Sequence, residues 1–161
     1  MELSELEYPN TVLQLRDGAR IDLRESLGPA AREALARQGL SGAFAVLSAF
    51  PAPSQSRPRD ESERLTERLR RVVRAFDAQD VDVLASSPCG AHTEPSVAAA
   101  LSRRDALAIA RLFDQAALFW FDGERMWIDW TDGRASTALP IASSTFKVSG
   151  LRAGLDESGA H

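Results

Sequence analysis

The side chains most capable of chemistry in this sequence lie close together, in the segment Cys89-Gly90-Ala91-His92-Thr93-Glu94-Pro95-Ser96. This segment combines a thiol, an imidazole, a carboxylate and a hydroxyl group. In an extended backbone, successive side chains point to opposite faces, so His92, Glu94 and Ser96 would share one face, although Pro95 can interrupt that alignment. The segment is therefore the first candidate for a functional site.

Four interpretations of this segment stay open. His92 and Glu94 could act as a general acid/base pair, or Cys89 could be a nucleophile that His92 activates. Glu94, Ser96 and His92 could instead bind a ligand together with Ser48, which ends an apolar run elsewhere in the chain. Glu94 could also brace the adjoining loop by accepting backbone hydrogen bonds. No diagnostic catalytic motif accompanies the segment, so the sequence does not decide whether the protein is an enzyme.

We expect no metal and no cofactor. Cys89 and His92 have a spacing typical of metal ligands, but a tetrahedral structural site needs four ligands, and the other histidine is the terminal His161. A second candidate, an anion site near Arg57 and Arg59, is disfavoured by the acidic residues that follow. Asp60 is expected to cap the long helix there, with Glu63 completing a capping box.

Aromatic side chains cluster near residue 120 and could contact a partner. With alternate residues facing opposite sides of a strand, some of them must belong to the core. A stacking platform for nucleic acid is disfavoured because the net charge is −4 and the isoelectric point is about 5.2. A protein partner could bind the hairpin that carries Trp127. The aromatic residues are Phe119, Trp120, Phe121, Trp127 and Trp130.

The elements that must position these residues follow from periodicity and turn residues. Asp-Gly pairs at Asp17 and Asp122 predict an N-terminal and a C-terminal hairpin. The apolar run Phe44 to Phe50 predicts a strand at the centre of the sheet. Helical spacing predicts three helices. The expected fold class is α+β: a mixed β-sheet with terminal hairpins and about three helices packed on it. The helices are expected at 29–38, from residue 60 into the seventies and at 102–113, and the other two strands near 81–85 and 97–101.

Residues 1–130 are expected to form a single domain, and residues 131–161 a poorly structured tail rich in Ser, Gly and Ala. No apolar stretch is long enough to span a membrane, and the first residues do not resemble a secretion signal. The single cysteine, Cys89, agrees with a reducing compartment. These features predict a cytoplasmic protein without a membrane partner.

From about Phe44 to Trp130 the sequence resembles a bacterial family catalogued as domain of unknown function 3293. The resemblance rests on the run Phe44 to Phe50, on His92-Thr93-Glu94-Pro95-Ser96, and on the pattern from Asp105 to Gln115. It implies a fold and a site location but no activity. We therefore expect a small ligand-binding or regulatory module with its pocket near His92 to Ser96. The alternatives are a small hydrolase or transferase that uses Glu94 and His92, and a protein-interaction module that uses the C-terminal hairpin.

Overall fold

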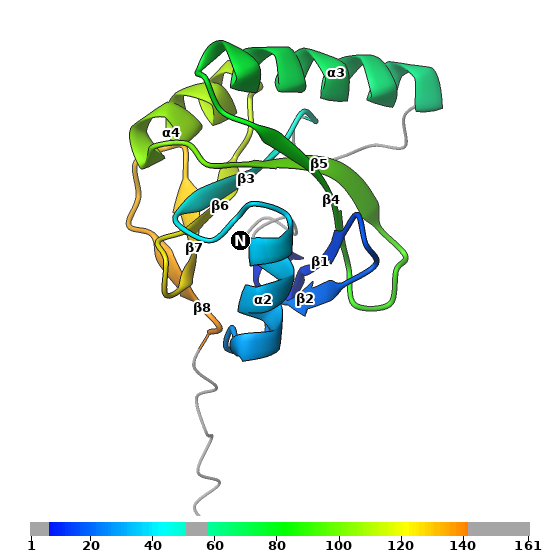
Figure 1. Ribbon diagram of the computed structural model, residues 1–161. Coiled ribbons are helices and arrows are strands. Elements are labelled where there is room, and N and C mark those ends of the chain that lie inside the picture. The colour runs from blue at the N-terminus through cyan, green and yellow to red at the C-terminus, as the bar shows by residue number, and fades with distance from the viewer. Residues whose placement is uncertain (1–6, 51–57, 142–161) are drawn as a thin grey trace, which may run out of the picture.

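The fold is an eight-stranded sheet with three α-helices packed on it, seen in a computed structural model that describes residues 7–50 and 58–141 (Figure 1). The strand order is β2-β1-β4-β5-β3-β6-β7-β8. The fold class is therefore α+β, as predicted. The elements are the short 3₁₀ helix η1 (Tyr8–Asn10), β1 (Val12–Leu15), β2 (Arg20–Asp22), α2 (Pro29–Arg37), β3 (Phe44–Ser48), α3 (Arg59–Ala75), β4 (Asp80–Ser86), β5 (Thr93–Ala99), α4 (Arg103–Leu112), β6 (Ala117–Phe121), β7 (Met126–Trp130) and β8 (Thr137–Leu139).

The prediction of a mixed sheet is wrong, because every strand pair in the described part of the chain is antiparallel. The reason lies in the two helical crossovers. Strands β3 and β4, which α3 connects, run parallel to one another, but β5 lies between them and pairs with both. In the same way β3 separates β5 from β6, which α4 connects. Each crossover therefore skips one position and leaves only antiparallel neighbours.

The sheet is curled and has a hydrophobic core on each face. Helices α3 and α4 cover one face, and α2 lies in the curve of the other (Figure 1). The inner core, on the α2 face, contains Leu35 of α2, Val46 of β3 and Phe119 of β6. The outer core, under α3 and α4, contains Leu47 of β3, Leu69 of α3 and Ile109 of α4. Because β3 contributes to both cores, its apolar run is continuous, as a central strand requires.

The helices follow the predicted apolar spacing, but one of the two predicted caps is absent. Ser102 caps α4, since its hydroxyl oxygen accepts a hydrogen bond from the Asp105 backbone N–H at 3.1 Å. The long helix α3 begins at Arg59 after Pro58, with no side-chain cap. Asp60 therefore does not cap it. Glu63 instead pairs with Arg59 at 2.9 Å, one helical turn away. No helix of the described residues is long and apolar enough to cross a membrane.

The turn of the N-terminal hairpin depends on a glycine. Gly18 has a φ of +88°, a left-handed conformation that glycine adopts without a steric penalty. Its N–H donates to the Leu15 carbonyl at 2.9 Å, while the Leu15 N–H donates to the Ala19 carbonyl at 2.8 Å. These bonds close the turn between β1 and β2, which contains Arg16.

The ordered structure continues beyond Trp130, where the tail was predicted to begin. Strand β8 pairs with β7, with Leu139 opposite Met126. Leu139 is buried in the inner core. A strand as short as β8 forms here because β7, at the edge of the sheet, supplies its hydrogen-bonding partners. Residues 142–161, the rest of the predicted tail, lie outside the described residues.

Candidate functional site

Three of the predicted site residues, Ser48, Glu94 and Ser96, lie together. Ser48 of β3 is paired with Ser96 of β5. The Ser48 hydroxyl donates to Glu94 Oε1 at 2.5 Å and accepts from the Phe50 backbone N–H at 3.2 Å. The Ser96 hydroxyl donates to the Glu94 backbone carbonyl at 3.3 Å. The Glu94 carboxylate therefore links the end of β3 to the beginning of β5.

This polar cluster is at the edge of the inner core, beside Tyr8. Glu94 is paired with Ala85 of β4, a residue that packs against that core. Tyr8 lies with its ring edge-on to Phe119 and Trp130, at centroid distances of 5.8 and 5.6 Å. Burial raises the pKa of Tyr8 to about 12, and the negative charge of Glu94 contributes to the rise. The phenol is consequently neutral at ordinary pH.

His92 and Cys89 lie in the loop between β4 and β5. The Ser87 N–H donates to the His92 carbonyl at 2.9 Å, and the His92 N–H donates to the Ser87 hydroxyl at 3.1 Å. A hydrogen bond with Ser87, followed by the Ala91 backbone, lowers the pKa of the exposed Cys89 thiol. Among the described residues, no hydrogen bond or ion pair joins His92 to Glu94. These two bonds between Ser87 and His92 therefore close the loop.

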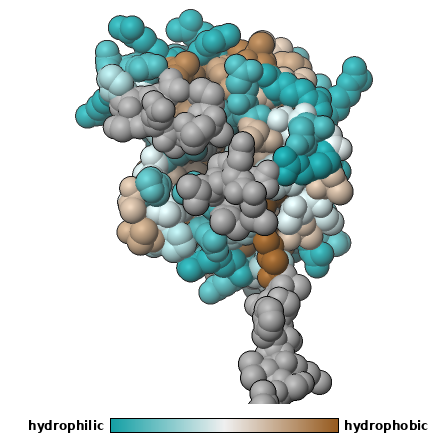
Figure 2. Space-filling view, turned by 180° about the vertical axis from the view of Figure 1, so that it is seen from behind, coloured by the Kyte–Doolittle hydropathy of each residue, from teal (hydrophilic) through white to brown (hydrophobic). Residues whose placement is uncertain are grey.

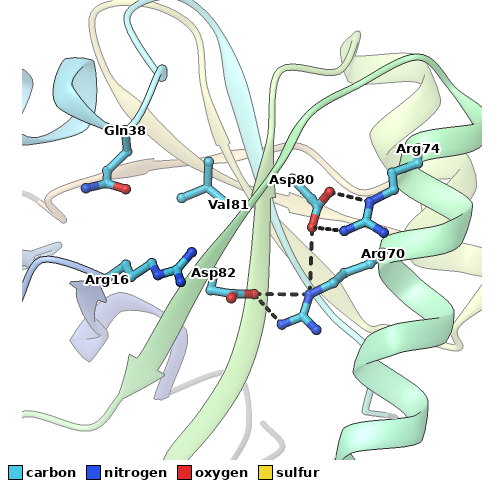
Figure 3. A pocket seen from close by; sticks show the side chains of 7 residues that line it. All are labelled: Arg16, Gln38, Arg70, Arg74, Asp80, Val81 and Asp82. Carbon is cyan, nitrogen blue, oxygen red and sulfur yellow. Dashed lines mark hydrogen bonds and ion pairs between the residues drawn. The ribbon is translucent and has the colours of Figure 1, made fainter.

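The opposite face of the sheet has a groove beneath α3 that the sequence did not indicate. Two adjoining hollows of about 360 and 380 Å³ share Arg16, Arg70 and Asp82 in their linings. We call them together the α3 groove. The first hollow is also lined by Gln38, Arg74, Asp80 and Val81 (Figure 3), and the second by residues that include Gln14, Thr66, Leu84, Pro95 and Ser96.

Strand alternation and helical spacing explain which residues line the α3 groove. Val81, Val83 and Ala85 of β4 face the inner core, so Asp80, Asp82 and Leu84 face α3. On α3 the lining residues are Thr66, Arg70 and Arg74, four residues apart and therefore on one side of the helix. Across the sheet, Leu84 lies between Gln14 of β1 and Pro95 of β5. The groove thus has α3 as one wall and β1 as the other, with β4 as its floor.

Ion pairs fill one end of the α3 groove. Arg70 contacts Asp82 directly and lies 3.7 Å from Asp80, which Arg74 binds at 2.7 Å (Figure 3). Hydrogen bonding to Asp82 raises the pKa of Arg70, and hydrogen bonding to Asp80 raises that of Arg74. Both aspartates and both arginines are therefore committed to one another.

Arg16 differs from the other two arginines of the groove. In Figure 3 the Asp82 side chain lies between those of Arg16 and Arg70. Among the described residues, the Arg16 side chain has no hydrogen-bond or ion-pair partner. The neighbouring Asp17 faces away to Arg37, at 3.5 Å. At the other end of the groove, Leu84 keeps 39 % of its surface exposed. The groove therefore combines an exposed apolar side chain with a cation that has no ion-pair partner in the described part of the chain.

The sequence-based site and the α3 groove overlap at Pro95 and Ser96, which line the second hollow. The remaining lining residues were missed. Two signals could have found them: the alternation of Asp80, Asp82 and Leu84 along a strand with apolar residues between them, and the four-residue spacing of arginines on a helix that must face that strand. Neither signal identifies a groove until the pairing of β4 with β1 is known.

The aromatic hairpin does not form a broad exposed apolar surface. Trp127 is partly buried against the outer core; its indole N–H donates to Asp122 at 2.8 Å, and Arg125 lies over its ring. Figure 2 shows a face of the molecule on which hydrophilic residues predominate and hydrophobic areas are small. The described residues also contain no group of three or more His, Cys, Asp or Glu side chains arranged to hold a metal ion.

Comparison with known families confirms the resemblance inferred from the sequence. A family model described as "Protein of unknown function (DUF3293)" matches residues 47–118, and over these residues the chain resembles that family. The matched segment includes α3, β4, β5 and α4, so it supplies one wall and the floor of the α3 groove, while β1 lies outside it. No curated protein and no solved structure matches the chain.

Proposed function

We propose that this protein is a small ligand-binding module and that its ligand occupies the α3 groove. The proposal is carried by one hollow whose lining includes Leu84, which is 39 % exposed, and Arg16, whose guanidinium has no hydrogen-bond or ion-pair partner among the described residues. The volume of that hollow, about 380 Å³, lies within the roughly 300–1,000 Å³ typical of small-molecule sites. Polar groups at one end and apolar groups at the other can fix the orientation of a ligand.

Binding is favoured over catalysis by the state of the polar groups in the groove. Asp80 and Asp82 are held by arginines, and the Thr66 hydroxyl donates to the Ser62 carbonyl at 2.9 Å. An acid/base role for His92 with Glu94 stays a prediction, and among the described residues no hydrogen bond or ion pair joins the two side chains. A partner surface at Trp127 is disfavoured by the hydrogen bond and the arginine that occupy this residue.

Within this proposal Glu94 has a supporting role. Its hydrogen bond with Ser48 fixes the beginning of β5, and the next two residues along β5, Pro95 and Ser96, line the groove. The carboxylate therefore positions one side of the binding site from the opposite face of the sheet. A cytoplasmic location, expected from the sequence, accords with a role in binding a metabolite.

The proposal can be tested by NMR with three probes that share an octyl chain: octanoate, octanamide and octyltrimethylammonium. At least one probe is expected to shift the backbone amide signals of Leu84, Arg70 and Gln14. The exposed Gln14 should tolerate replacement by tryptophan, a residue that suits strands. Gln14→Trp would fill the groove and abolish these shifts, whereas Leu112→Trp, on the exposed surface of α4, should not change them.

The proposal would be overturned by either of two results. In the first, no probe shifts the amide signals of the groove residues at saturating concentration. In the second, Gln14→Trp retains its fold, judged by dispersed amide signals, and binds the probes as tightly as the unsubstituted protein.

A further inference from the structure

We infer that the ligand of the α3 groove is a medium-sized molecule with one carboxylate group and an apolar chain, with the carboxylate at Arg16 and the chain over Leu84 and Pro95. The inference rests on the proposed function and gives the chemical class of the ligand. It is drawn from the distribution of charge and apolar surface along the groove.

The charges of the groove favour an anion. The lining residues include three arginines and two aspartates, a difference of one positive charge. Because Asp80 and Asp82 are already paired with Arg74 and Arg70, a cationic ligand would have to displace an arginine from one of them. An anion can bind Arg16 without breaking an existing ion pair, and a guanidinium can donate two parallel hydrogen bonds to a carboxylate.

A single carboxylate fits the groove better than a phosphate group. Of the three arginines in the described groove lining, Arg16 alone has no acidic partner, so one guanidinium is available to bind the ligand. Gln14 of β1 precedes Arg16 by two residues, lines the same hollow and is exposed. Its amide group can donate one more hydrogen bond. This donor set matches the two oxygens of a carboxylate, whereas a doubly charged phosphate would leave charge uncompensated beside Asp82.

The apolar part of the ligand follows from the row of residues that crosses the floor. Gln14, Leu84 and Pro95 are neighbours in register on three adjacent strands. Two strand spacings separate Gln14 from Pro95, a distance of about 10 Å. Leu84, in the middle of this row, is 39 % exposed. An alkyl chain that lies along the row would cover Leu84 and remove its apolar surface from water.

Affinities of the three octyl probes for the protein and its variants test the inference, with amide shifts as the readout. Octanoate should bind more tightly than octanamide and octyltrimethylammonium. Arg16→Ala should weaken octanoate binding about tenfold or more, since a charge-assisted hydrogen bond is lost, and should leave octanamide binding nearly unchanged. Arg104→Ala is the matched control, because Arg104 is exposed on α4 and lines neither hollow. Leu84→Thr should weaken binding of octanoate severalfold, and Leu112→Thr should not.

The outcomes separate the ligand class from the proposed function. If octanamide or octyltrimethylammonium shifts the groove amides while octanoate does not, the carboxylate assignment is wrong and the groove remains a binding site. Unchanged octanoate affinity in Arg16→Ala would also overturn the assignment. If none of the probes shifts the groove amides, both the ligand class and the proposed function are wrong.

Discussion

The hydroxyl group of Ser48 donates to the Glu94 carboxylate at 2.5 Å and so connects the end of β3 with the beginning of β5. These two strands lie side by side at the centre of the sheet. A hydrogen bond to a charged acceptor is stronger than one between neutral groups. The link is therefore expected to contribute to stability and to hold the strand that carries Pro95 in place.

Glu94→Gln and Ser48→Ala should each lower the free energy of unfolding by about 1–3 kcal/mol, because each removes a charge-assisted hydrogen bond in a partly buried setting. Denaturant unfolding measures the change. Glu124→Gln, at an exposed position of the loop between β6 and β7, serves as the control and should have little effect. If Glu94→Gln unfolds at the same denaturant concentration as the parent, the link does not brace the sheet.

Tyr8 is the single tyrosine of the chain, so phenolate absorbance follows this residue alone. Burial, and then the charge of Glu94, raises its pKa to about 12 in the folded protein, compared with about 10 in an unfolded chain. Alkaline titration of the folded protein should therefore show a midpoint near 12. Glu94→Gln removes the nearby negative charge and should lower that midpoint, which an unchanged titration curve would contradict.

The raised pKa of Tyr8 also makes stability depend on pH. Between about pH 10 and 12 the unfolded chain loses the phenol proton and the folded protein retains it, so fewer protons are bound in the unfolded state. The free energy of unfolding should therefore be unaffected by Tyr8 below about pH 10 and fall as the pH rises from there towards 12. Tyr8→Phe should show a smaller decline over this interval. Equal declines in the two proteins would exclude Tyr8 as the cause.

Asp129 of β7 is buried, with 2 % of its side chain exposed, and binds Arg103 of α4 through two hydrogen bonds of 2.6 Å. Ser136, which precedes β8, also donates to it. Arg103→Ala leaves a buried carboxylate without its cation. Removing one partner of a fully buried ion pair lowers the free energy of unfolding by roughly 3–5 kcal/mol. Because Arg103 is half exposed, Arg103→Ala should lower it by about 2–3 kcal/mol. The adjacent Arg104→Ala is the control. Similar unfolding of the two variants would contradict this role of Arg103.

Leu139→Ala should destabilise the protein by about 2–4 kcal/mol, because the side chain is 3 % exposed and packs in the inner core. Ile141→Ala, only two residues further on but 54 % exposed, should change stability by less than about 0.5 kcal/mol. Thermal melting of the two variants distinguishes them. Equal melting temperatures would show that β8 does not contribute to the core.

Much of the fold could be predicted from local signals. The helix from Pro29, the Ser102 cap and the buried run at β3 depend on residues close in sequence, where propensity, capping and burial act. The pairing of the strands and the burial of Leu139 could not be predicted from local signals. Whether β5 lies between β3 and β4, and whether Leu139 finds a sheet edge, depends on contacts between distant segments.

In the candidate site too, features that depend on residues close in sequence could be predicted, and features that depend on distant contacts could not. The sequence placed Glu94 and Ser96 on one face of a strand and named Ser48, and the structure brings these three together. His92 lies in the loop between β4 and β5, one residue before β5 begins, and its backbone is bonded to Ser87. Arg16 gave no signal at all, since an arginine after a short strand resembles any surface residue until β1 is paired with β4.

The most direct test of ligand binding in the α3 groove is a measurement of intermolecular nuclear Overhauser effects between the tightest-binding octyl probe and the methyl groups of the protein. Contacts are expected from the octyl chain to the Leu84 methyl groups, accompanied by contacts to Pro95, with none to the exposed Leu112 of α4. Contacts confined to Leu112 or Phe76, or no contact to Leu84 when the probe saturates the protein, would contradict binding in this groove.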